Sequence, residues 1–231
     1  MRYLVDHRRT PLRTHAVAWW LLTLAVIAAA LMPTAAAAGE LTREQALQAL
    51  QQSDARARMA GVARLAEIGR MPDADRLVPR LRDVQPEVRE GAQQAMWRIW
   101  SRSGDPAIDR LFAKGLQHME DSSLDQALAV FDDIVKRKPA FAEGWNKRAT
   151  LYFLLGEHEK SLKDCDEVLK RNPNHFGALS GAGQIHLQLG HPEQALAFFK
   201  RAYQVNPNLE NLEEVIQMLE EHLRGNGHVT T

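Results

Sequence analysis

Histidine and cysteine are the side chains of this chain with the greatest capacity for metal or nucleophilic chemistry. Beyond residue 38 the histidines are His118, His158, His175, His186, His191, His222 and His228. They are scattered, and no two stand at ligand spacing with a third ligand in reach. The sequence also lacks a His-Glu-x-x-His motif, a phosphate-binding loop and a Gly-x-Ser-x-Gly turn. These residues indicate no catalytic site, no metal site and no cofactor, and we expect a protein that is not an enzyme.

Cys165 is the single cysteine of the chain. One cysteine cannot form an internal disulfide, so its thiol is either reactive, linked to a partner, or a small apolar group inside a helix. In the repeat pattern described next, Cys165 occupies the position of Phe131 and Phe199. That position favours a buried apolar residue over a reactive thiol.

Three prolines divide the second half of the chain into units of equal length. Pro139, Pro173 and Pro207 follow one another at equal intervals, and each closes a segment with the pattern of two amphipathic helices. Proline lacks the N–H that a continuing helix needs, and it biases the preceding residue away from the helical conformation. The spacing therefore predicts a stacked helical repeat.

Equivalent positions of the three units carry small residues beside large ones. The first unit has Leu111, Gly115, His118, Ser122, Ala127 and Phe131, the second has Trp145, Ala149, Tyr152, Gly156, Ser161 and Cys165, and the third has Leu179, Gly183, His186, Gly190, Ala195 and Phe199. Over residues 106–209 this pattern resembles the tetratricopeptide repeat family. The resemblance implies stacked hairpins whose first helices line a concave groove that binds peptides or partner helices.

Residues 40–104 follow a different repeat, whose period is slightly shorter than the spacing of the prolines. The aligned pairs are Ala57-Arg58 with Val88-Arg89, Gly61 with Ala92, Leu65 with Met96, and Ile68 with Ile99. The pattern resembles short HEAT-like repeats, which also occur in phycobilin lyases, although a shared scaffold does not carry activity with it. Gln52 stands where the second unit has Asp83, which weakens the case for an Asp–Arg ladder between the units.

Strand patterns are nearly absent, so we expect an all-α fold: a helical-repeat solenoid of HEAT-like hairpins followed by tetratricopeptide hairpins. Trp97 and Trp100 lie on one helix face, and we expect them to fill the seam between the two repeat types; an exposed docking patch is the alternative. The solenoid would be continuous, with a change of pitch at the helix after Pro106. Residues 210–224 have the spacing of a capping helix, or of a free helix for a partner, and 225–231 form a tail.

Residues 1–38 have the pattern of an export signal. Arginines precede an apolar run over residues 16–32, and small residues follow, so cleavage is expected after Ala38. The alternative is an uncleaved membrane tether through residues 16–32, because that run is long enough to span a bilayer at the short limit. Either reading places the repeats outside the cytoplasm: periplasmic or secreted, or anchored to the inner membrane and facing the periplasm.

The charge balance gives no sign of a nucleic-acid partner. The chain contains 29 Lys and Arg residues and 29 Asp and Glu residues, without a concentrated basic stripe. We therefore expect a protein or peptide partner. The sequence leaves the oligomeric state open.

The family resemblance also indicates which side chains would line the groove. Carried over to this sequence, they are Phe112, Leu116, Met119, Asn146, Thr150, Phe153, Gln184, Leu187 and Gln188. Family members that hold a C-terminal carboxylate use Lys, Asn and Arg, whereas Phe112 and Leu116 stand in the first unit here. An apolar lining with amide donors suits an extended or helical segment with hydrophobic side chains.

These observations favour a scaffold or chaperone-like adaptor that is exported to the cell envelope and binds a peptide or helix in the groove. One alternative is a membrane-tethered assembly factor for an envelope protein complex. A third hypothesis, an accessory subunit of an enzyme, would need a polar cluster that the sequence does not show.

Overall fold

The computed structural model describes residues 41–227, and the chain divides into two units, residues 1–36 and 37–231. The helices are α1 (Arg43–Ala49), α2 (Ala55–Ile68), α3 (Met71–Leu77), the 3-10 helix η4 (Val78–Arg82), α4 (Pro86–Trp100), α5 (Pro106–Glu120), α6 (Leu124–Arg137), α7 (Ala142–Leu154), α8 (His158–Arg171), α9 (Phe176–Gln188), α10 (Pro192–Val205) and α11 (Leu212–Gly227). No strand occurs in this range, which confirms the all-α prediction. The predicted export signal or tether, residues 1–38, lies outside the described part. Within that part, no helix combines the length and apolar character needed to cross a membrane.

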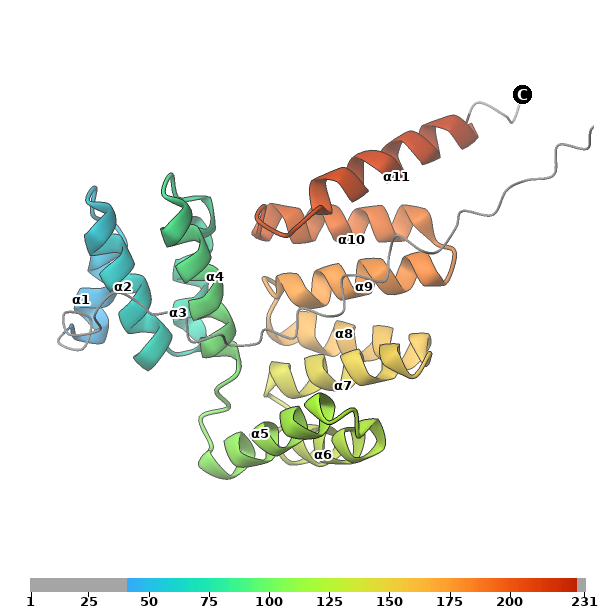
Figure 1. The fold of residues 1–231 in the computed structure, drawn as a ribbon, viewed down its shortest axis with the longest axis horizontal. Coiled ribbons are helices and arrows are strands. Elements are labelled where there is room, and N and C mark those ends of the chain that lie inside the picture. Colours follow the sequence, from blue (N-terminus) through green and yellow to red (C-terminus); the bar gives the residue numbers. More distant parts are fainter. Residues whose placement is uncertain (1–40, 228–231) are drawn as a thin grey trace, which may run out of the picture. The chain divides into compact units, whose positions relative to one another are not determined.

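Helices α5 to α10 form three hairpins that stack in chain order, with α11 packed on α10 (Figure 1). In each hairpin the second helix presses a phenylalanine or cysteine against a small residue of the first. A Cβ added at Gly115 would lie 2.6 Å from the Phe131 ring, and one at Gly183 would lie 2.6 Å from Phe199. The small residues of the repeat pattern are therefore required by close helix approach, as predicted.

The turns within the hairpins share one backbone geometry. Gly156 and Gly190 have φ angles of 75°, and Ser122 has a φ of 57° at the same position of the first hairpin. Glycine adopts such angles at little cost, whereas a residue with a Cβ is strained there. The prolines Pro139, Pro173 and Pro207 follow the second helices, where the sequence pattern predicted the ends of the units.

Arg148 of α7 connects three consecutive helices of the stack. Its guanidinium donates to Asp164 of α8 through two bonds of 2.7 Å and to Asp132 of α6 through one of 2.8 Å. The same group lies 4.9 Å from the ring centroid of Trp145 and 5.6 Å from that of Tyr152. This guanidinium fixes the relative positions of the three helices. A lysine could not do so, because its ammonium forms no bidentate pair and does not stack on aromatic rings.

We expect Arg148→Ala to lower the free energy of unfolding by about 3–5 kcal/mol, because it leaves the buried carboxylate of Asp164 without its partner. Chemical denaturation monitored by circular dichroism measures this. The control is Arg137→Ala, which removes an exposed pair with Asp133 and should cost at most about 1 kcal/mol. Equal losses for the two variants would contradict the assignment.

Helices α1 to α4 form a second group, the N-terminal block (residues 43–100), with its own core around Leu65 and Met96. α2 packs on both α1 and α4. Arg58 of α2 donates to Asp83 through bonds of 2.6 and 2.7 Å, and both side chains are buried. An Asp–Arg pair therefore does link the two units of this repeat, although Gln52 had weakened that expectation.

The junction between the two kinds of hairpin is not where the sequence pattern predicted it. α4 packs on α2, α3 and η4, and α5 packs on α6, but α4 and α5 do not form a packed pair. Instead, Trp97 and Trp100 contact His175 and Phe176 at the start of α9, and Phe176 belongs to the core of the N-terminal block. The tryptophans do fill a seam, as predicted. The prediction of a continuous stack through the helix after Pro106 is wrong, because α4 does not pack on α5.

Hydrogen bonds secure the N-terminal block to two of the turns between repeats. They run from Asn174 to Asp75 (2.9 Å), from Asn206 to Gln93 (2.5 Å), from Asn208 to the Leu81 carbonyl (2.6 Å) and from Arg82 to the carbonyls of Tyr203, Gln204 and Val205. Both turns have the sequence Asn-Pro-Asn, at 172–174 and 206–208, whereas the turn at 138–140 reads Lys-Pro-Ala. The extra asparagines mark the turns that bind the block.

Candidate partner-binding site

Two of the predicted groove residues serve the fold instead of a partner. Phe112 is 4% exposed and packs edge-on against Phe131 and Phe141, at centroid distances of 5.8 and 5.3 Å. Asn146 is buried, and its amide donates to Glu143 at 3.1 Å. For Phe112 and Asn146 the prediction is therefore corrected, because neither side chain is free to contact another molecule.

The other predicted residues are at least partly exposed. They are Leu116, Met119, Thr150, Phe153, Gln184, Leu187 and Gln188. Lys147, Thr150 and Leu154 follow one another along one face of α7, and Gly177, Gln184 and Gln188 along one face of α9. α7 and α9 contact each other, and we call the surface that carries these six residues the α7–α9 face.

Leu154 is a member of this face that the sequence reasoning missed. Its side chain is 46% exposed at the end of α7, one turn beyond Thr150, and the neighbouring Leu155 is 41% exposed. The signal was present in the sequence as the run Phe153-Leu154-Leu155 immediately before Gly156. Large aliphatic side chains at the surface beside amide groups suit an apolar partner segment.

Glu143, in the first turn of α7, is fully buried and held by three donors. Nε2 of His175 lies 2.9 Å from its carboxylate, and Asn146 and the Lys147 ammonium each lie 3.1 Å away. Nδ1 of His175 accepts the N–H of Ala178 at 3.0 Å. The neutral imidazole therefore carries its proton on Nε2 and donates it to Glu143.

These contacts keep Glu143 ionised. Burial raises the pKa of Glu143, but attraction to Lys147 and hydrogen bonds from His175 and Asn146 outweigh burial and lower the pKa to about 2. A carboxylate that is tied to a histidine and an ammonium in this way resembles a catalytic dyad. However, Glu143 and His175 are both buried, and the Trp100 ring stacks on His175 at 4.4 Å, so the pair is closed to solvent.

The depressed pKa of Glu143 makes stability depend on pH. Because the pKa is about 2 in the folded chain and 4.5 ordinarily, its stabilising effect is complete above pH 4.5 and is lost as the pH falls towards 2. We expect Glu143→Gln to lower the free energy of unfolding at pH 7 by about 3 kcal/mol. The variant should also lose less stability than the wild type as the pH falls from 4.5 to 2. Denaturation at a series of pH values measures this, with the exposed Glu159→Gln as control. If the variant lost as much stability below pH 4.5 as the wild type, Glu143 would not be the source of this pH dependence.

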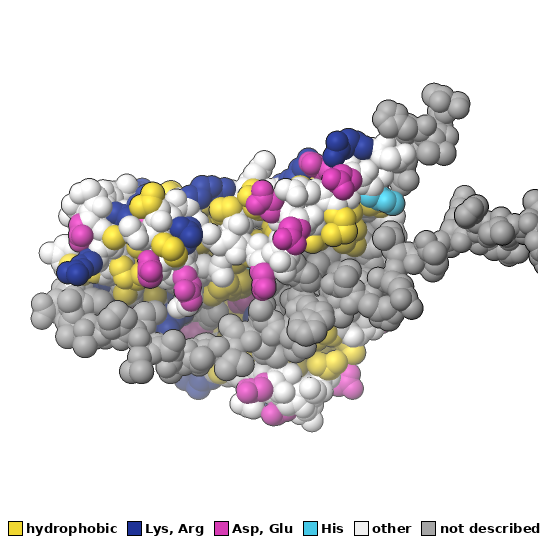
Figure 2. Space-filling view, turned by 45° about the horizontal axis from the view of Figure 1, so that its top comes forward, with side chains coloured by type: hydrophobic (Ala, Val, Ile, Leu, Met, Phe, Trp, Pro, Cys, Tyr) yellow, Lys and Arg dark blue, Asp and Glu magenta, His cyan; other side chains and the backbone are white. Residues whose placement is uncertain are grey.

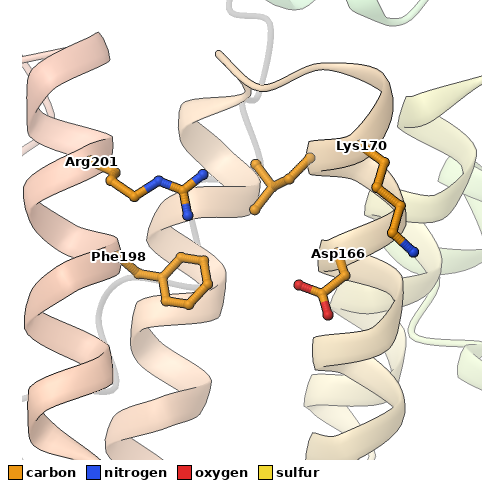
Figure 3. A pocket seen from close by; sticks show the side chains of 5 residues that line it. Asp166, Lys170, Phe198 and Arg201 are labelled. Carbon is orange, nitrogen blue, oxygen red and sulfur yellow. The ribbon is translucent and has the colours of Figure 1, made fainter.

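A shallow hollow of about 290 Å³ lies between α8 and α10, on the second helices of their hairpins. Asp166, Leu169, Lys170, Phe198 and Arg201 line it, and Figure 3 shows Asp166, Phe198 and Arg201 directed towards the space between the helices. The Arg201 guanidinium lies 5.2 Å from the Phe198 ring. No pattern in the sequence indicated this hollow. Its lining holds no nucleophile paired with a base.

The state of the Cys165 thiol is explained by packing. Burial raises the pKa of Cys165 to about 12, so its thiol stays protonated and the interpretation as a buried apolar residue is confirmed. Within residues 41–227, no three His, Cys, Asp or Glu side chains are placed to hold a metal ion. On the face shown in Figure 2, acidic and basic side chains are interspersed with hydrophobic ones.

Comparison with known proteins points to one family. Models of the tetratricopeptide repeat match residues 112–169 and 141–208. A TPR repeat-containing protein of Rhizobium etli is 33% identical over 153 residues, which are 66% of this chain and 75% of that protein. The anaphase-promoting complex subunit 7 of Dictyostelium discoideum is 35% identical over 88 residues, 38% of this chain and 15% of that protein.

Among solved structures, the Sgt2 TPR domain of Aspergillus fumigatus superposes with a TM-score of 0.50. It shares 17% sequence identity, and the match covers 55% of this chain and 85% of that domain. At this identity the likeness concerns the fold of the repeats. The HEAT-like character of the N-terminal block stays a prediction.

Proposed function

The chain belongs to the tetratricopeptide repeat proteins, and from this premise we propose that it is a non-enzymatic protein-interaction scaffold or chaperone-like adaptor. Its partner is a peptide or helix with hydrophobic side chains, bound on the α7–α9 face. The observation that carries the proposal is the exposure of Leu154, which is 46% exposed and belongs to no core cluster of the described residues, on the same face as Gln184 and Gln188. The adjacent Phe153 and Leu187 are half-buried and pack in part against the hairpin cores.

The chemistry of this face supports hydrophobic recognition over recognition of a terminal carboxylate. Leu154, Thr150, Gln184 and Gln188 of this face carry no charge, and neither do the predicted groove residues Leu116 and Met119 on the neighbouring hairpin, which are partly exposed on α5. On α7 the Lys147 ammonium is engaged by Glu143. Aliphatic anchors would therefore supply the affinity, and the amides would orient the backbone of the bound segment.

The double variant Phe153→Ala with Gln184→Ala should abolish capture of the partner and leave the helix content intact. A photo-cross-linking residue at Gln188, used in intact cells and analysed by mass spectrometry, measures capture. The matched control replaces Lys163 and Gln194, which are exposed on the second helices α8 and α10, by alanine. Adducts that persist in the Phe153/Gln184 variant at the control level would refute the proposed face.

We also propose that the protein acts in the cell envelope after export. The support is the sequence of residues 1–38, with its basic start, apolar run and small residues before Gly39. If the segment remains attached, the protein is a tethered assembly factor, and if it is removed, a free periplasmic or secreted adaptor.

N-terminal sequencing of the protein purified from its native cell should find a start at Gly39. Cell fractionation measures the same property independently, because the processed protein should leave the membrane fraction without detergent. Retention of residues 16–32 would favour the tethered assembly factor. A full-length protein in the cytoplasmic fraction would contradict export altogether.

A further inference from the structure

Trp97 lies against the α7–α9 face although it belongs to the N-terminal block. The Lys147 ammonium of α7 is 5.8 Å from the centre of its indole. On α9, a Cβ added at Gly177 would lie 2.6 Å from the indole, so the ring rests directly on the glycine backbone. His175 and Phe176 meet the ring edge-on at 5.3 and 5.2 Å. One aromatic side chain thus contacts both first helices.

The position of the indole relative to the predicted partner residues follows from helical periodicity. Lys147 precedes Thr150 and Leu154 on the same face of α7. Gly177 likewise precedes Gln184 and Gln188 on α9. The indole therefore covers the N-terminal end of the α7–α9 face, and the exposed side chains lie at the C-terminal end.

Several contacts hold the indole in this position against α7 and α9. Trp100, on the same helix, stacks on His175 at 4.4 Å with an interplanar angle of 21°. The hydrogen bonds from the two Asn-Pro-Asn turns fix the same block nearby. A partner would have to break all of these contacts to reach the N-terminal end of the face.

We propose that the Trp97 side chain fills part of the partner-binding face of the repeats and thereby determines which partners can bind. It occupies an aromatic-binding position at the N-terminal end of the α7–α9 face, so an incoming segment is confined to the C-terminal half and binds there through aliphatic side chains. This rests on the proposed function and is supported by the continuity of the open half with the interface that Trp97 already forms. Removal of the indole would leave a seat beside Lys147 and Gly177 that fits a partner tryptophan or tyrosine.

The test compares the peptides selected by three full-length proteins from one phage-displayed library of random dodecapeptides. The proteins are the wild type, Trp97→Ala, and the matched control Trp97→Phe, which keeps an aromatic ring in the seat. We expect the wild type and the control to select peptides rich in Leu, Ile and Met. Trp97→Ala should select peptides with an added Trp or Tyr, and the synthetic consensus should bind that variant at least ten-fold more tightly than the wild type.

The outcomes separate the inference from the function on which it rests. If all three proteins select the same peptides with equal affinity, Trp97 does not determine specificity, but the scaffold function stands. If none selects any peptide, the proposed binding face fails, and the inference fails with it. Circular dichroism checks that Trp97→Ala is folded. Gly177→Ala provides a second route, because its methyl group would displace the indole without removing it, and it should show the same gain of aromatic peptides to a smaller extent.

Discussion

The contact between His175 and the tryptophans of α4 is the interaction on which the rest of this structure depends. The imidazole accepts the N–H of Ala178 at the start of α9, donates to Glu143 of α7 and stacks on Trp100 of α4. One side chain therefore begins a helix, satisfies a buried charge and joins the two kinds of hairpin. The first two of these roles require the same neutral tautomer, with the proton on Nε2.

This junction makes the two ends of α7 and α9 different. Their N-terminal turns are occupied by buried polar groups and by the indole of Trp97, where an ionised carboxylate is tolerated because three donors surround it. Their C-terminal turns carry exposed aliphatic and amide side chains. If partners bind the C-terminal end as proposed, stability and partner recognition use different ends of the same helices, so side chains at the proposed recognition end can vary with little effect on the core.

The equal intervals between the three prolines and the small residues beside Phe131 and Phe199 were sufficient to predict the hairpins and their packing, because periodicity and volume are local properties. The position of the N-terminal block was not predictable in the same way. Helical spacing places Trp97 and Trp100 on one face but does not say which of three similar turns that face meets. Phe112 was assigned to the groove by its repeat position, yet its ring completes an aromatic core with Phe141, a contact between units that no position within one unit reveals.

The attachment of residues 43–100 to turns much later in the chain has a consequence for cooperativity. In a linear array each repeat touches only its neighbours, so such arrays can lose structure from either end, one unit at a time. Here the hydrogen bonds that Asn174 donates to Asp75 and that Asn206 donates to Gln93 bridge across the intervening hairpins. These bonds join the N-terminal block to the last repeats. If the last repeats unfold, the first helices therefore also lose contacts. We expect such an array to unfold cooperatively, and its long-range contacts to form slowly, because they close long loops.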